Sequence, residues 1–144
     1  SAYAASAGDI LITRLMMRGG AGVVTDGGFR DAMNIAKLEM PAYHNRPSSP
    51  TNLTTNEAID INVPIGCGGA PVFPGDIVVG DDDSIIIIPA HLADEIAEVC
   101  SGMESFEAFV LEEVLAGTPI IGLYPCTKEE NQKKFENWQR ERGQ

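Results

Sequence analysis

The 144-residue sequence predicts an α/β protein. Two patterns predict this class. Apolar residues recur with the 3.6-residue period of a helix over residues 6–20 and 90–117, and short apolar runs typical of strands lie at residues 21–25 and 76–89. A chain of this length buries roughly 70% of its unfolded surface when it folds. The length therefore suffices for one domain with a hydrophobic core.

The first elements predict a helix, a strand, a loop and a second helix. An amphipathic helix covers SAGDILITRLMMRGG, with its buried face made by Ile10, Leu11, Leu15 and Met16. The run AGVVT is then a short buried strand, DGGFRD is the loop at its carboxyl end, and AMNIAKL is a short helix that Pro41 ends. An α/β arrangement follows from this alternation.

The middle of the chain predicts strands. PAYHNRP is a short strand, EAIDINVPI opens a second series of strands, and GCGGAPVFPGD is a glycine-rich turn. The segments DIVVG and SIIIIP, joined by the acidic turn DDDS, form a hairpin. Four consecutive isoleucines predict that the second strand of this hairpin is buried on both faces.

The last third of the chain predicts helices. A long helical region starts at Ala90 and ends at Gly117, with Gly102 as a candidate interruption. Its predicted buried stripe is Leu92, Ile96, Val99, Met103, Phe106, Phe109, Val110 and Val114. Residues 124–144 contain a charged helix with Phe135 and Trp138 on one side. We expect this helix to pack on the preceding domain or on a neighbouring subunit.

Composition excludes several classes of function. The formal net charge of −11 repels nucleic acid, and no stretch approaches the ~18 apolar residues of a membrane helix. The three cysteines, Cys67, Cys100 and Cys126, are far apart and have no metal-ligand spacing, so we expect free thiols in a reducing cytoplasm. The sequence predicts a cytoplasmic protein that contacts neither nucleic acid nor membrane.

Two segments contain candidate site residues. The loop DGGFRD places Arg30 beside Asp31 after a strand, and Gly8 and Asp9 open the first helix, where the backbone N–H groups of Ile10 and Leu11 lack helical partners. Together they would offer amides and a guanidinium to a carboxylate, with two aspartates for Mg²⁺, a set that suits an α-keto acid. A structural alternative remains open, in which Asp9 caps a helix, Arg30 and Asp31 form a surface ion pair or a helix start, and the glycines form turns.

The quoted segments resemble the RraA-like family. The resemblance rests on GD followed by a helix, on RGGAGVVTDGGFRDA, and on PVFPGDIVVGDDDSIIIIP followed by a long helix. It extends to about Leu123, and its motif is a glycine and aspartate about twenty residues before an arginine-aspartate pair. The family includes aldolases for 4-hydroxy-4-methyl-2-oxoglutarate and 4-carboxy-4-hydroxy-2-oxoadipate.

The resemblance implies a fold and an activity. The fold is a swivelling β/β/α domain, here residues 1–123 with residues 124–144 as a helical extension, assembled as a homotrimer or hexamer with sites at subunit interfaces. The activity is retro-aldol cleavage of a small α-keto acid, or decarboxylation of oxaloacetate, through a pyruvate enolate. By position, Asp31 and Asp9 would hold Mg²⁺ or Mn²⁺, Arg30 would bind substrate, and the amides next to Gly8, those of Ile10 and Leu11, would hold the pyruvate carboxylate.

The sequence departs from the family pattern in three places. Asn34 stands where the aldolases have an acidic residue, and Asp83-Ser84 replaces the usual aspartate-glycine of the hairpin turn. The family's N-terminal portion, which contributes part of the pocket wall, has no counterpart before Gly8. Because the first residue, Ser1, is not methionine, we expect the chain to be the carboxyl part of a longer protein.

The sequence favours catalysis over several other functions. The namesake branch of the family inhibits a ribonuclease by protein contact and tends to lack the aspartate after the arginine, so the presence of Asp31 favours an enzyme. No glycine-rich nucleoside-binding motif supports a methyltransferase, a label given to such sequences. The two histidines, His44 and His91, are separated by a hairpin and predict no catalytic dyad. The turn GDDDS lacks the spacing of a calcium loop.

Overall fold

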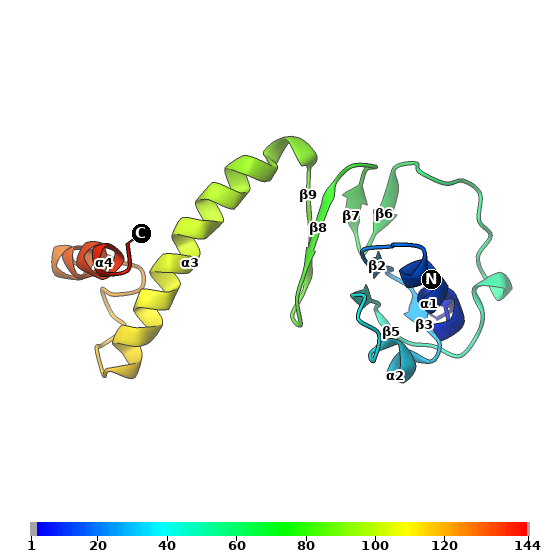
Figure 1. The fold of residues 1–144 in the computed structure, drawn as a ribbon, viewed down its shortest axis with the longest axis horizontal. Helices are drawn as coiled ribbons and strands as arrows, with labels where there is room; N and C mark the ends of the chain where they lie inside the picture. Colours follow the sequence, from blue (N-terminus) through cyan, green and yellow to red (C-terminus); the bar gives the residue numbers. More distant parts are fainter. Residues whose placement is uncertain (1–2, 144) are drawn as a thin grey trace. The chain divides into compact units, whose positions relative to one another are not determined.

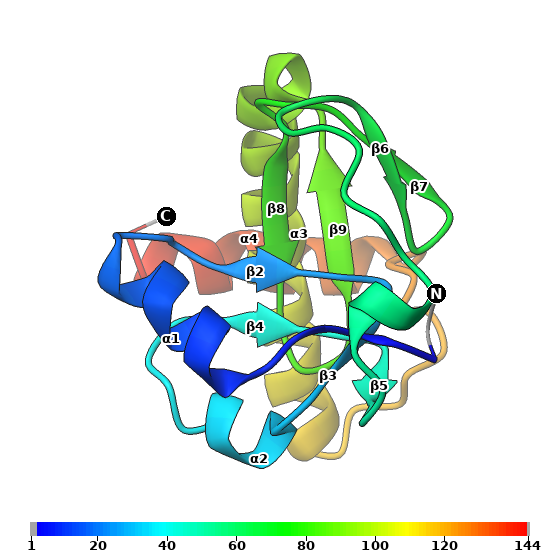
Figure 2. The ribbon, with the colours of Figure 1, turned by 90° about the vertical axis from the view of Figure 1, so that its right-hand side faces the viewer.

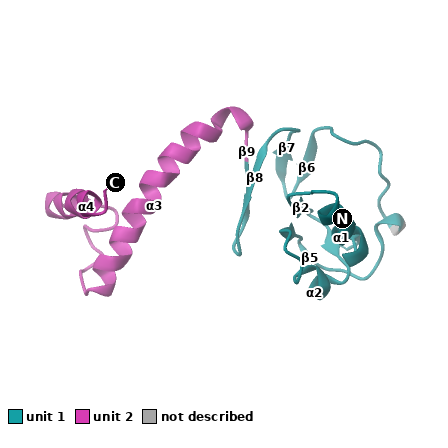
Figure 3. Ribbon diagram, viewed as in Figure 1, with its two compact units in different colours: residues 1–87 teal, residues 88–144 magenta. Residues whose placement is uncertain are grey.

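The computed structural model describes residues 3–143, with the side chain of Thr54 excepted. The chain divides into two compact units, residues 1–87 and residues 88–144 (Figures 1 and 3). Strands and short helices alternate in the first unit, and the second consists mainly of helices. The predicted α/β class is confirmed. Among the described residues, no helix combines the length and apolar character needed to cross a bilayer.

The first unit contains nine short strands and three short helical segments among its described residues. In chain order the elements are β1 Ala5–Ala7, α1 Asp9–Met17, β2 Val23–Val24, β3 Gly28–Phe29, α2 Ala32–Ile35, β4 Ala42–Tyr43, β5 Arg46–Pro47, the 3₁₀ segment Asn52–Thr54, β6 Ile65–Cys67, β7 Ala70–Val72, β8 Ile77–Gly80 and β9 Ile85–Ile88, whose last residue begins the second unit.

Parallel pairing organises the part of this unit that precedes β6. Strands β1, β3 and β5 form one sheet in which β3 is central, and β2 pairs with β4 (Figure 2). The close approach of β3 and β5 requires glycine at position 28, because an added Cβ would contact Ser48 Cβ and lie 2.9 Å from the Arg46 carbonyl oxygen. Two hairpins follow, β6 with β7 and β8 with β9.

Several predicted elements of this unit were wrong. The first helix was predicted from Ser6, but Ser6 and Ala7 belong to β1 and α1 begins at Asp9. The loop DGGFRD contains the strand β3, and PAYHNRP forms two strands, β4 and β5. The segment EAIDINVPI has no strand before Ile65, and its Ile59 and Ile61 are 95% and 85% exposed. Apolar alternation produces a strand only where another strand is available to accept and donate its hydrogen bonds.

The core of the first unit differs from the predicted apolar face of α1. Ile12 is fully buried with Phe29, Ile35 and Met40, and Met16 packs against this cluster. Ile10, Leu11 and Leu15, which were predicted to be buried, are exposed. Ile12 and Met16 are four residues apart and so share one face of α1, and this face packs on the core. Ile10 and Leu11 lie on a neighbouring face, which borders a cavity.

The hairpin of β8 and β9 was predicted correctly, but the burial of its isoleucines was not. The side chain of Ile86 is 57% exposed, so β9 is not buried on both faces. The Asp81 carboxylate closes the turn, since its Oδ1 accepts the N–H groups of Asp83 and Ser84 at 2.9 Å each. These backbone bonds, that of Ser84 first, lower the pKa of the Asp81 carboxyl. The predicted acidic turn is confirmed, and residues 81–84 are exposed.

The second unit is a helical hairpin. It contains the 3₁₀ segment Ala90–Leu92, α3 Ala93–Leu115 and α4 Glu129–Glu141. Helix α3 continues through Gly102, so the candidate interruption there was wrong. Gly117 has φ of +93°, and its N–H bonds the Val114 carbonyl, which confirms it as the residue that ends the helical region.

Helix α4 packs on the carboxyl half of α3. Phe109, Val110 and Leu123 are buried there, and Phe106, Phe135 and Trp138 pack against them. Glu112 accepts hydrogen bonds from Trp138 Nε1 at 2.9 Å and from Arg142 at 3.0 Å. The predicted stripe is too long, because Val99 and Met103 remain 57% and 58% exposed beyond the reach of α4. The division at residues 123 and 124 stays a prediction.

Candidate functional site

Parallel pairing of β1 with β3 brings the predicted site residues together. Ala5 pairs with Gly28 and Ala7 with Phe29, and the Arg30 N–H donates to the Ala7 carbonyl at 2.9 Å. The carboxyl ends of parallel strands meet at the same edge of a sheet, and each of these two strands is followed by a helix. The segment Gly8–Asp9, after β1, therefore lies beside Arg30–Asp31, after β3.

Gly8 is the point of closest approach between the two segments. A Cβ at this position would lie 3.1 Å from Asp31 Oδ2 and 3.2 Å from Arg30 Nη2. The Gly8 backbone, with φ of −115° and ψ of 177°, is extended and accessible to any residue. Space for the arginine and the aspartate, rather than a special conformation, is the reason for glycine here.

Asp31 adopts an uncommon backbone conformation. Its φ of 60° and ψ of 33° lie in the left-handed region, which non-glycine residues seldom occupy. Its carbonyl oxygen accepts the N–H groups of Asn34 and Ile35, so the residue starts α2 through its backbone. Its side chain makes no cap hydrogen bond, and Oδ2 instead faces Arg30 Nε at 3.4 Å. Strain of this kind is common at functional sites.

Asp9 does not act as a helix cap either. The N-cap of α1 is Gly8, and no side chain caps this helix. Asp9 Oδ2 accepts a hydrogen bond of 2.9 Å from Asn34 Nδ2, which links α1 to α2. An acidic residue in place of Asn34 would bring a second negative charge to Asp9, whereas the amide donates to it. The cap alternative is therefore not supported for Asp9, whose neighbour Gly8 is the N-cap of α1, whereas Asp31 is the N-cap of α2 and does start that helix.

The remaining alternative was a surface ion pair. The side chains of Arg30 and Asp31 are 51% and 39% exposed, and a pair with this exposure adds little to stability. The guanidinium also lines a cavity of about 440 Å³. Its described lining residues are Ala5, Ser6, Ala7, Gly8, Ile10, Leu11, Arg14, Arg30, Thr51, Asn52 and Leu53. The arginine therefore has a cavity in which to bind a ligand.

The cavity suits an anion. The first turn of α1 borders it, and the N–H groups of Ile10 and Leu11 have no intrahelical acceptor, since the first helical bond runs from the Ile12 N–H to the Gly8 carbonyl. Arg14, which sequence reasoning missed, is a second arginine in the lining. Its spacing of four residues from Ile10 and three from Leu11 is the sequence signal that places it on the same helix face.

Two carboxylates are available to a metal ion. Asp9 and Asp31 stand at the starts of α1 and α2. Within residues 3–143, no group of three acidic, histidine or cysteine side chains is arranged to hold a metal. Mg²⁺ commonly binds one or two carboxylates and takes its other ligands from water and substrate. The hard oxygen donors of Asp9 and Asp31 fit this preference.

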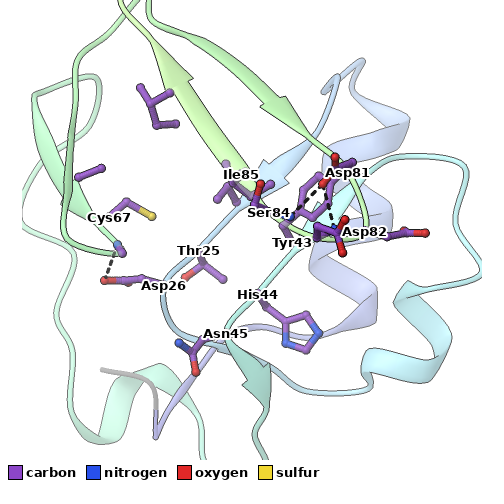
Figure 4. A pocket seen from close by; sticks show the side chains of 15 residues that line it. Thr25, Asp26, Tyr43, His44, Asn45, Cys67, Asp81, Asp82, Ser84 and Ile85 are labelled. Atoms are coloured by element: carbon purple, nitrogen blue, oxygen red, sulfur yellow. Dashed lines mark hydrogen bonds between the residues drawn. The ribbon is translucent and has the colours of Figure 1, made fainter. Parts of the chain in front are cut away.

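A second cavity of about 400 Å³ lies in the same unit (Figure 4). Thr25, Asp26, His44 and Cys67 are among its lining residues. The His44 ring stacks on Phe29 with centroids 5.0 Å apart, and its buried Nδ1 has no hydrogen-bond partner among the described residues. His91 belongs to the second unit. Cys67, Cys100 and Cys126 are free thiols, as predicted.

Comparison with protein families gives a match over the first unit. A family model described as RraA-like, Aldolase/RraA, matches residues 1–87. This range coincides with the first compact unit and contains every predicted site residue. Its coincidence with the unit means that the segments brought together by β1 and β3 belong to the matched region.

Curated relatives carry aldolase names. A protein of Halalkalibacterium halodurans named "Putative 4-hydroxy-4-methyl-2-oxoglutarate aldolase" is 39% identical over 85 residues, which are 59% of this chain and 40% of that protein. A protein of the same name from Ectopseudomonas mendocina is 32% identical over 86 residues, 60% of this chain and 52% of that protein. The chain thus spans about half the length, or less, of these relatives.

Solved structures share the fold. An uncharacterized protein of Pseudomonas syringae superposes with a TM-score of 0.76 at 22% identity, over 84% of this chain and 60% of that one, which shows the fold alone. Streptomyces coelicolor RraAS2, described as an unusual member of the RNase ES inhibitor RraA protein family, is 33% identical with a TM-score of 0.67, over 76% of this chain and 56% of that one.

Proposed function

The chain belongs to the RraA-like family, and from this premise we propose that it is a divalent-metal-dependent carbon–carbon lyase acting on a small α-keto acid. One observation carries the proposal. Gly8 meets Arg30 and Asp31, and Asp9 binds Asn34 of α2, beside a cavity lined by two arginines and the first turn of α1. The aldolase names of two relatives support the same class of reaction.

The proposed reaction is retro-aldol cleavage or decarboxylation. The bond between C3 and C4 of the substrate breaks, its electron pair enters a pyruvate enolate, and protonation at C3 yields pyruvate. The N–H groups of Ile10 and Leu11 bind the C1 carboxylate at the start of α1, where the helix dipole favours negative charge. Arg30 lies beside the keto oxygen and stabilises the charge that develops there.

Asp31 and Asp9 are the proposed ligands of Mg²⁺ or Mn²⁺. The metal would supply a further positive charge at the keto oxygen. Asn34 holds the Asp9 carboxylate through its 2.9 Å hydrogen bond and so restricts its orientation. Arg30 Nε, 3.4 Å from Asp31 Oδ2, orients the second carboxylate in the same manner.

The proposal includes the assembly that the family resemblance implies. Residues 1–123 would form the carboxyl part of a swivelling β/β/α domain with residues 124–144 as its helical extension. The family's N-terminal portion would complete the pocket wall, within a homotrimer or hexamer. The exposure of Ile77, Val78 and Val79 on β8, each above 40%, is consistent with a surface that further protein covers.

The direct test is pyruvate release from oxaloacetate. We expect a rate that depends on both the protein and Mg²⁺ and that excess EDTA abolishes. Because free Mg²⁺ itself promotes the reaction, the reference is Mg²⁺ with substrate and no protein. Pyruvate is measured by NADH oxidation in a coupled lactate dehydrogenase assay. Equal rates with and without the protein would reject the lyase proposal for this chain.

Replacing Gly8 by alanine should impair the site without unfolding the chain. The new Cβ would press on Asp31 Oδ2 and Arg30 Nη2, and such displacements reduce kcat/KM by roughly 10- to 100-fold. The Gly8 backbone accepts alanine without strain, so the melting temperature should stay within a few degrees of wild type. Gly66→Ala is the matched control, since its Cβ meets nothing within 4 Å. Equal kcat/KM for the two variants would contradict the assigned position of the site.

A second candidate function is regulation of a ribonuclease. The likeness to RraAS2 at 33% identity favours it, because that protein is placed in the RNase ES inhibitor family. The expected result is dose-dependent inhibition of a purified RNase ES-type endonuclease by the chain, with Asp31→Asn as active as wild type. If the chain inhibits the endonuclease and releases no pyruvate from oxaloacetate, the lyase proposal is rejected and the regulator proposal is supported.

A further inference from the structure

The cavity at α1 has a charge opposite to that of the chain. The sequence contains 21 acidic and 10 basic residues, yet the described lining residues include Arg14 and Arg30 and neither aspartate nor glutamate. Arg30 is paired with Asp31. Arg14 has no carboxylate within ion-pair distance among residues 3–143. An unpaired guanidinium in an acidic protein, at a cavity wall, is free to bind an anionic ligand.

Arg14 lies one helical turn from the amides that would hold the first carboxylate. Ile10, Leu11 and Arg14 share the cavity-facing side of α1, while Ile12 on another side is buried in the core. One turn of an α-helix advances about 5.4 Å. The amides and the arginine are therefore offset along the helix by roughly the length of a four- to five-carbon acid, so one ligand can contact both.

We propose that Arg14 determines specificity by binding the carboxylate farther from the keto group in a dicarboxylic α-keto acid. The proposal rests on the proposed function, since the first carboxylate is the one assigned to the Ile10 and Leu11 amides. Guanidinium binds a carboxylate through two parallel hydrogen bonds, which adds geometric selectivity to charge. In this assignment Arg30 contacts the keto oxygen and Arg14 binds the distal carboxylate.

This assignment has a consequence for the choice between the two reactions. In retro-aldol cleavage of a 4-hydroxy-2-oxo dicarboxylic acid, the distal group is still a carboxylate after the C3–C4 bond breaks. In decarboxylation, the distal carboxylate leaves as neutral CO₂ and its electron pair enters the enolate. A guanidinium on that carboxylate stabilises the ground state more than the transition state. Arg14 therefore favours substrate binding in both reactions but slows decarboxylation.

The test compares two ligands of equal chain length that differ in the distal carboxylate. Calorimetric titration with 2-oxoglutarate and with 2-oxopentanoate, at one fixed Mg²⁺ concentration, is carried out on wild type, Arg14→Gln and Arg18→Gln. Arg18, the C-cap residue that follows α1 and lies outside the cavity lining, is the control for loss of charge. Wild type and Arg18→Gln should bind 2-oxoglutarate about tenfold or more tightly than 2-oxopentanoate, and Arg14→Gln should bind both alike.

The outcomes separate this inference from the function on which it rests. Equal affinity of wild type for both ligands overturns the role of Arg14 and leaves the keto acid site standing. If wild type binds neither 2-oxoglutarate nor 2-oxopentanoate, both the role of Arg14 and the keto acid site are overturned. A kinetic measurement gives a second readout, in which Arg14→Gln should raise KM for oxaloacetate without lowering kcat. A fall in kcat would show that Arg14 takes part in bond cleavage, and would contradict its assignment as a residue that only binds the distal carboxylate.

Discussion

Replacing Asp31 by asparagine should reduce Mg²⁺-dependent pyruvate release by about 100-fold or more, because a charged group next to the reacting atoms is lost. The fold should survive, since asparagine has the same shape and tolerates the left-handed backbone that Asp31 adopts, with φ of 60°. The measurements are kcat with oxaloacetate and the thermal unfolding midpoint. Retention of more than a tenth of the wild-type kcat would exclude Asp31 as a metal ligand.

The left-handed backbone also dictates which other variants are informative. Asp31→Ala combines loss of the carboxylate with about 1–2 kcal/mol of backbone strain, so its loss of activity would be ambiguous. Asp31→Gly removes the carboxylate and relieves the strain. We expect Asp31→Gly to be as inactive as Asp31→Asn and at least as stable as wild type. Asp31→Gly less stable than Asp31→Ala would contradict a left-handed backbone at this position.

Replacing Phe29 by alanine should destabilise the first unit by about 3–5 kcal/mol, the usual cost of removing a buried aromatic side chain. Phe29 is 1% exposed, belongs to the central strand β3 and directly precedes Arg30. Its loss removes contacts with Ile12 and Ile35, which hold α1 and α2 in place behind the site. The free energy of unfolding by urea and the affinity for 2-oxoglutarate should fall together.

Phe109→Ala is the matched control for this variant. Phe109 is 2% exposed in the core of the helical hairpin, so the same chemical change occurs in the second unit. It should lower the stability of the hairpin, seen as loss of helical circular dichroism at lower urea. Because all proposed site residues lie within residues 1–87, ligand affinity should remain close to that of wild type. Loss of binding in Phe109→Ala comparable to that in Phe29→Ala would show that the site depends on the second unit.

Local patterns in the sequence predicted several elements correctly. The hairpin of β8 and β9 followed from two apolar runs joined by four polar residues, and the end of α3 followed from Gly117. Both are decided by residues close together in the chain, through turn hydrogen bonds and a left-handed glycine. The predicted strand over EAIDINVPI failed for the opposite reason, because strand formation depends on a partner that is distant in sequence.

The site was predicted through its motif, and the geometry supports that grouping. Gly8, Asp9, Arg30 and Asp31 were selected because strand ends and helix starts collect ligands, and the structure brings Gly8 next to Arg30 and Asp31. Two features of the site were not predicted. Asn34 donates to Asp9, and Arg14 enters the cavity lining. The positions of both side chains depend on which face of their helix points away from the core. In α1 the core buries Ile12 and not Ile10, so the face with Ile10 and Arg14 points away from it.

The sequence by itself determined the family, the α/β class and the residues of the motif, because these follow from residue types and short spacings. Only the tertiary structure decided that Asp31 lies in the left-handed region, that Ile10 and Leu11 face a cavity, and that Arg14 joins them. The physical reason is the parallel pairing of β1 with β3. This pairing joins segments more than twenty residues apart, and it orients α1 and α2 by burying Ile12, Phe29 and Ile35 together.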